Sequence, residues 1–209
     1  MLAKVAIPTL FGVVAALVLA FVTGPGNESP GWVAPFLGAS LVFYFLLIFA
    51  PWIALRSGRP WWLASAIGAL VGLFLDLGVA FVVGGAGMSI CIDVSLGFGS
   101  SCPPPPQRPF GILFTIALGV LGIGQAFVVH GRAAKLVWAI GSIFAGAAMG
   151  FGVQLVNSAL HLNDAYLNYL PAAIGGLGWG VVIGMTLTLV TSTKIDPGSF
   201  LTPPKRQRR

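Results

Sequence analysis

The chain has 209 residues, of which 57% are hydrophobic and only 8% are charged. A soluble domain carries about 25% charged residues, so this composition excludes an ordinary soluble protein. The net charge of +6 does not indicate a nucleic-acid binder, because the basic residues are dispersed along short segments between apolar stretches instead of forming one patch.

Six apolar stretches follow one another along the chain, and each is as long as a membrane span. They cover residues 5–23, 33–55, 61–85, 109–130, 134–157 and 171–193. About 20 apolar residues in a helix cross a hydrocarbon core about 30 Å thick, and a spanning segment must satisfy its backbone hydrogen bonds internally. The pattern therefore predicts a single domain, residues 1–209, that is an all-α integral membrane bundle of six transmembrane helices.

The Lys and Arg residues predict the orientation of these helices. If the N-terminus is cytoplasmic, every Lys and Arg except Arg108 falls on the cytoplasmic side. Cytoplasmic loops carry such an excess because basic segments resist translocation. We therefore expect both termini in the cytoplasm. The expected membrane is the inner membrane of a bacterium, and an organelle membrane such as the thylakoid is the alternative.

Three stretches followed by three give the two halves opposite orientations, which is typical of inverted repeats in transporters. The only internal similarity is short: residues 66–68 and residues 173–175 both read Ala-Ile-Gly. A 3+3 inverted topology is therefore an alternative description of the same six helices.

Small residues recur at every fourth position, which places them on one helix face. The first stretch has Gly12, Ala16 and Ala20 in this register. The glycines that we expect at helix–helix contacts are Gly68, Gly72, Gly146, Gly150, Gly176, Gly180 and Gly184. Membrane helices associate by close backbone approach over such residues. The pattern predicts tight packing, and a sliding or rocking surface is the alternative.

Aromatic residues distinguish the second stretch, which runs Phe43-Tyr44-Phe45 into further bulky residues. We expect this helix at the lipid-facing edge or against a partner subunit. Tryptophans near the ends of the stretches indicate an aromatic belt at the membrane interface. They are Trp32, Trp52, Trp61 and Trp62.

Asp76 is the one acidic residue near the middle of a predicted span. A charge at the bilayer centre costs about 2.5–3.5 kcal/mol on insertion scales, and such a residue is a functional hypothesis by default. In one interpretation Asp76 binds a proton, a cation or a polar substrate and couples it to helix movement. In the other it is protonated and donates a structural hydrogen bond to a neighbouring helix.

Other polar groups do not form a recognisable catalytic, metal or cofactor site. His130 and His161 fall at opposite sides of the predicted bilayer, so they cannot share one haem or metal, and either is only a weak candidate ligand for a pigment or haem. A polar patch near the outer end of the fifth stretch predicts a wet helix end, or else a vestibule or partner contact; it comprises Gln154, Asn157, His161, Asn163, Asp164 and Asn168. Acid–base and nucleophilic catalysis both need a positioned pair of groups. The sequence offers no such pair at membrane depth, so we expect no enzyme, no cofactor and no metal.

Residues 194–209 form the predicted cytoplasmic tail, which ends in a basic cluster of Lys205, Arg206, Arg208 and Arg209. Such residues on anionic headgroups contribute about 1 kcal/mol each near the surface, and a docking tail for a partner is the alternative. Together these features predict a non-catalytic, accessory subunit of a larger inner-membrane complex, in contact with lipid and with other subunits. A small proton- or cation-coupled transporter or channel that uses Asp76 is the second hypothesis.

The link of residues 86–108 contains both cysteines, Cys91 and Cys102, and the charge pattern places it outside the cytoplasm. An oxidising compartment permits a disulfide, and closing so short a loop contributes about 3 kcal/mol in the chain-entropy model. We predict that mass spectrometry without reductant finds Cys91 linked to Cys102. Two free thiols in protein purified without reductant would contradict both the bond and the exterior location of the link.

Overall fold

A computed structural model describes residues 2–23, 33–55, 60–75, 110–129, 131–162 and 167–192. Within these ranges the chain forms six helices: α1 (Leu2–Thr23), α2 (Val33–Leu55), the helix Pro60–Leu75, α4 (Phe110–Ala126), α5 (Arg132–Ala159) and α6 (Tyr169–Ser192). Three of them, α1, α5 and α6, are long and apolar enough to cross a membrane. The described part of the chain is therefore an all-helical bundle with the character of a membrane protein.

Within the described residues the helix boundaries follow the apolar stretches closely, with one clear departure; residues 76–85 of the third stretch lie outside the described residues. Residues 109–130 were expected to be one helix, but α4 ends at Ala126. The chain there tightens into bonds between residues three apart, such as Val128 N–H to the Gln125 carbonyl at 3.0 Å. Gly131 then adopts a φ of 90°, a value that glycine accepts without steric cost, and α5 begins at the next residue.

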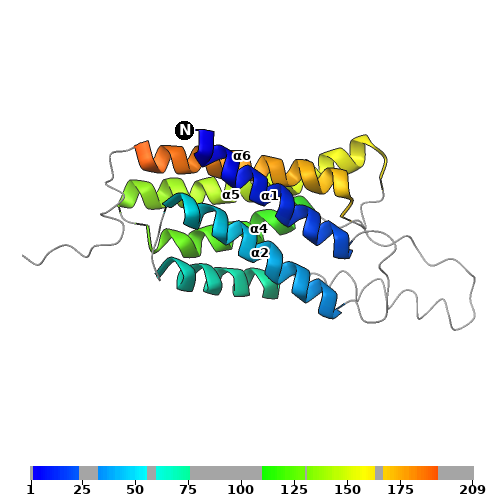
Figure 1. Cartoon of the computed structure of the whole chain (residues 1–209), viewed down its shortest axis with the longest axis horizontal. Coiled ribbons are helices and arrows are strands. Elements are labelled where there is room, and N and C mark those ends of the chain that lie inside the picture. The colour runs from blue at the N-terminus through cyan, green and yellow to red at the C-terminus, as the bar shows by residue number, and fades with distance from the viewer. Residues whose placement is uncertain are drawn as a thin grey trace, which may run out of the picture.

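The six helices lie side by side, and successive helices run in opposite directions (Figure 1). α1 packs on α2 and on α6, α6 packs on α5, and α5 packs on α4. The helix Pro60–Leu75 lies between α2 and α4: its Trp62 stacks on Phe45, and its Gly68 contacts Leu121. The neighbours therefore form a closed ring in chain order, with α1 and α6 completing it.

The two ends of the bundle differ in charge. α1 begins and α6 ends at the same end, where Lys4 Nζ donates a 2.7 Å hydrogen bond to Thr191 Oγ1. We call this the Lys4 end, and the opposite end, where α6 begins, the Tyr169 end (Figure 1). Arg132 and Lys135, in the first turn of α5, also lie at the Lys4 end. In the described ranges these three are the only charged side chains, so the described charge lies at one end.

Glycines form the seam between α1 and α6. A Cβ at Gly184 would lie 2.6 Å from Val5 Cα, and one at Gly180 would lie 2.6 Å from Thr9 N. Gly176 and Gly12 contact each other's backbone. Residue numbers rise along α1 as they fall along α6 in these contacts, so the two helices are antiparallel. Their backbones approach closely over two turns. Only residues without a side chain permit that approach.

The other seams also contain glycine. Gly146 of α5 faces the Phe114 carbonyl of α4, 2.6 Å from an ideal Cβ. A Cβ at Gly72 of the helix Pro60–Leu75 would lie 2.7 Å from the Tyr44 hydroxyl oxygen. Gly150 is buried within α5. All seven glycines that the sequence marks for packing are buried.

The Ala-Ile-Gly repeat does not place equivalent glycines in equivalent contacts. An inverted repeat that relates the helix Pro60–Leu75 to α6 also relates α4 to α1. Gly68 contacts α4, whereas Gly175 contacts the Met149 carbonyl of α5 at 2.6 Å from its ideal Cβ. The short sequence match therefore contributes no support for internal symmetry.

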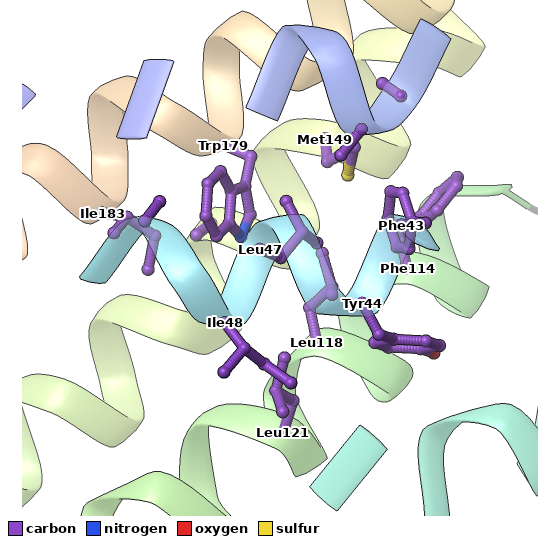
Figure 2. Close-up of a cluster of buried hydrophobic side chains, with 14 of the residues drawn as sticks. Phe43, Tyr44, Leu47, Ile48, Phe114, Leu118, Leu121, Met149, Trp179 and Ile183 are labelled. Carbon is purple, nitrogen blue, oxygen red and sulfur yellow. The ribbon is translucent and has the colours of Figure 1, made fainter. Parts of the chain in front are cut away.

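One face of α2 fills the centre of the bundle (Figure 2). Its side chains there are at most 5% exposed, and they are Phe43, Tyr44, Leu47 and Ile48. Figure 2 shows them among Trp179 and Ile183 of α6 and Leu118 and Leu121 of α4. The opposite face, with Leu41 and Phe45, is exposed, so α2 reaches the surface of the bundle and also fills its centre, which the sequence did not predict.

The bundle is apolar on its outside as well as in its core. Large apolar side chains are exposed on all six helices, for example Leu10, Phe45, Phe74, Ile112, Phe144 and Leu177. The buried polar side chains are Ser40, Ser65, Gln125, Ser142, Asn157 and Thr186, each at most 4% exposed. A helix of a soluble bundle also turns an apolar face inward, but it carries charged residues on its outer face.

The α1–α6 seam generates a stability prediction. Replacing Gly180 with Ala forces a methyl group into the α1 backbone, and overpacking of this kind costs about 1–3 kcal/mol. The Gly180→Ala variant should therefore unfold at a lower temperature in detergent, measured by circular dichroism. The matched control is Gly152→Ala, whose new Cβ would lie 3.5 Å from Gly175 Cα, an ordinary contact. Equal midpoints for the two variants would contradict the seam.

Candidate functional site

A cluster of polar side chains is buried between three helices at the Lys4 end. Gln125, in the last turn of α4, has its amide 3% exposed. Its Nε2 donates to Ser65 Oγ of the helix Pro60–Leu75 at 3.0 Å, and its Oε1 accepts a bond from Trp138 Nε1 of α5 at 3.2 Å. One glutamine thus joins three helices through both ends of its amide.

Two further groups complete this cluster, which we call the Gln125 cluster. Ser142 Oγ donates to the Trp138 carbonyl at 2.8 Å, a bond within α5. Trp61 packs edge-on against the Trp138 ring, with the centroids 5.4 Å apart. Trp61 is 2% exposed, and its Nε1 meets no acceptor among the described residues. Trp61 lies at the start of the helix Pro60–Leu75, and its ring faces into the bundle; its level at a membrane interface stays a prediction.

The local sequence explains why these groups meet. Gly68 and Gly124 bring the helix Pro60–Leu75 and α4 close together, because a Cβ at Gly124 would lie 3.2 Å from the Ala64 carbonyl. Gly122 contacts the Ser142 side chain from the other side. Small residues on both faces of the last two turns of α4 therefore let Gln125 reach two helices at once.

A second polar group ties the link before α6 to the end of α5. Asn157 is fully buried, its Oδ1 accepts a 3.3 Å bond from Asn168 Nδ2, and its carbonyl accepts a 2.9 Å bond from Leu162 N–H. Asn157 Nδ2 meets no acceptor within the part of the chain that the structure describes. His161 lies in the turn just beyond α5 with a φ of 52° and an exposed ring. These residues form a turn at the Tyr169 end that is anchored from within by an amide.

Several residues that the sequence singles out lie outside the described residues. They are Asp76, Cys91, Cys102, His130, Asn163, Asp164, Lys205, Arg206, Arg208 and Arg209. The structure instead brings together Gln125, Ser65 and Trp138, and the sequence analysis selected none of these three residues. A signal was available, since Gln125 is a lone amide inside an apolar stretch. The partners that it reaches, 60 and 13 residues away, follow from the packing alone.

The chemistry of the described groups is hydrogen bonding. The groups consist of amides, indoles and hydroxyls, with the exposed imidazole of His161 beside the second, and the described ranges contain no Asp or Glu side chain. Within the same ranges no group of three His, Cys, Asp or Glu residues could hold a metal ion. Amides and hydroxyls of this kind join helices by hydrogen bonds. No known protein family, curated protein or solved structure matches this chain.

The Gln125 cluster predicts a coupled loss of stability. Gln125→Leu keeps most of the volume but leaves Ser65 Oγ and Trp138 Nε1 without their partner, and an unsatisfied buried group costs about 1–3 kcal/mol. We expect a lower unfolding free energy in detergent, and a double-mutant cycle with Trp138→Phe should give a coupling of about 0.5–1.7 kcal/mol, the upper part of the range for membrane proteins.

The control for this prediction is Thr115→Val. The Thr115 hydroxyl bonds only to the Gly111 carbonyl of its own helix, at 2.5 Å, so its removal breaks no contact between helices. Equal destabilisation by Gln125→Leu and Thr115→Val, together with zero coupling in the cycle, would show that Gln125 does not join the helices.

Proposed function

We propose that this protein is a multi-pass integral membrane protein with six spans, and that it acts as a non-catalytic subunit of a larger inner-membrane complex. The membrane location rests on the apolar outer surface of the bundle: large apolar side chains are exposed on all six helices, while six polar side chains are buried. In water, exposed apolar surface of this extent promotes aggregation. In lipid it is the favourable arrangement, because the acyl chains are as apolar as the side chains.

The distribution of charge supports an orientation with both termini in the cytoplasm. Lys4, Arg132 and Lys135 all lie at the Lys4 end, where α1 begins and α6 ends. The sequence adds Arg56, Arg59 and the tail to the segments that leave this end. Since cytoplasmic loops carry the excess of Lys and Arg, the Lys4 end is the cytoplasmic one in this proposal.

The packed centre of the bundle favours a subunit over a channel. Leu47 of α2 is 1% exposed, and Leu118 of α4 and Trp179 of α6 lie on different sides of it (Figure 2). A conduction path needs polar groups or a water-filled opening along its length. The described centre instead holds interlocked apolar side chains, and this observation carries the proposal.

An aromatic surface on α2 fits contact with a neighbouring subunit. Phe45 stacks on Phe49 at 5.6 Å and on Trp62 at 5.9 Å, and Phe49 stacks on Trp52 at 5.2 Å. Phe45 is 52% exposed, so the edge of this stack faces outward. Rigid aromatic rings are enriched at the contacts that dominate interface energies. We assign this surface to the partner that the proposal requires.

A proton- or cation-coupled transporter is the second candidate, and it rests on Asp76. Gly68 and Gly72, at the two preceding period-four positions, are both buried against other helices. A carboxyl group at the next position of that face would lie among helices instead of lipid. This is a reason to test Asp76 directly.

Purification from native membranes in a mild detergent tests the proposal. A subunit should bring stoichiometric partner proteins with it, and Phe45→Ala, which removes an exposed ring, should reduce their yield at least severalfold. Phe144→Ala on α5 is the matched control, because its ring is also exposed. A lone chain whose thermal stability responds to pH or to one cation, and loses that response in Asp76→Asn, would contradict the subunit role and favour the transporter.

A further inference from the structure

An apolar groove runs along the outside of the bundle between α1 and α2. It has a volume of about 650 Å³ and extends on α1 from Val14 to Val22 and on α2 from Gly38 to Val42. Tyr169, the first residue of α6, lies at its mouth. Among the described lining residues, Tyr169 alone has a polar group on its side chain. The groove therefore accepts a ligand made of hydrocarbon, with one hydroxyl available at its end.

Gly38 leaves space in the groove for a bound ligand. The glycines of the helix seams are each opposed by a neighbouring helix: Gly180 contacts Thr9, and Gly146 contacts Phe114. A Cβ at Gly38 would meet no atom of the described residues within 4 Å. Glycine within a helix costs about 0.5–1 kcal/mol relative to alanine, so its usual reason is a close approach by another group. At Gly38 no described residue supplies that group.

The extent of the groove favours a lipid chain over a protein partner. It covers eight residue steps of α1, which is about 12 Å at 1.5 Å per residue, and lies in the half nearer the Tyr169 end. A specific protein interface buries about 1,200–2,000 Å², and a groove confined to two turns falls far short of that area. An acyl chain, in contrast, enters the bilayer from one interface and ends near its centre.

Tyr169 marks the level of the headgroup. Tyrosines are enriched at the membrane–water interface, where the ring lies in hydrocarbon and the hydroxyl remains wet. Tyr169 is 52% exposed and lies at the start of α6, with the groove running from it toward the centre of α1. The site therefore matches a phospholipid: the Tyr169 hydroxyl lies at the level of the polar headgroup, and the apolar groove lies at the level of the acyl chain.

We propose that this groove, lined by Val14, Gly38 and Val42 with Tyr169 at its mouth, binds one acyl chain of a phospholipid from the leaflet at the Tyr169 end. The inference rests on the proposed membrane location, but not on the subunit role. The lipid fills the space that Gly38 leaves, and it completes the contact between α1 and α2 in the outer half of the bundle.

The test is to count retained lipid. The protein is reconstituted in vesicles of phosphatidylethanolamine and phosphatidylglycerol, extracted in mild detergent and examined by native mass spectrometry. Gly38→Leu fills the groove from α2, and Val14→Phe fills it from α1. Each should lose about one phospholipid per chain relative to the unmodified protein. Ala66→Leu is the control, because it adds bulk to an exposed position on the helix Pro60–Leu75 and should retain that lipid.

Each remaining outcome counts against a defined part of the inference. Retention of the same lipid count by a folded Gly38→Leu or Val14→Phe protein would overturn the groove as a lipid site. A dimer that either variant dissociates would assign the groove to a second copy instead. Flotation with the vesicles is measured alongside: protein that does not float would refute the membrane location itself, whereas protein that floats with unchanged lipid would refute only this inference.

Discussion

The backbone contact between α1 and α6 is the constraint on which the rest of the arrangement depends. Helices that are neighbours in chain order are joined by a single link, whereas α1 and α6 are not. Their contact relies on Gly176, Gly180 and Gly184, which let the α1 backbone approach without an intervening side chain. In lipid, where burial of apolar surface gives little driving force, this close approach is the source of attraction. It converts a row of helices into a closed ring.

Closure of the ring explains how the polar groups are placed. Once α1 and α6 meet, the helices enclose a common core, and several amides and hydroxyls lie buried in the seams between them. Gln125 uses both ends of its amide there, and the Thr186 hydroxyl bonds to the Val182 carbonyl of its own helix at 2.8 Å. The hydroxyls that bond within a helix add little between helices. Directional contact between helices therefore depends on very few residues.

The sequence predicted which face of a helix is buried better than it predicted which residues of other helices that face contacts. Hydropathy located the helices, and period-four spacing identified buried glycines such as Gly146 and Gly180, because both signals are local along one helix. The same spacing does not say that Gly180 meets Thr9, since that pairing is set by the whole ring. For the same reason the position of Trp61 near a helix end did not reveal that its ring packs on Trp138 inside the bundle. The Gln125 cluster could be suspected from one lone amide but could not be assembled.

The hydrogen bond from Lys4 to Thr191 joins residues 187 positions apart, and this has a consequence for biogenesis. In the proposed membrane location α1 is synthesised before α6, so its glycine face has no partner until α6 has also been made. During that interval a chaperone, the insertion machinery or lipid must shield the face. A chain cut short before α6 would leave this face uncovered.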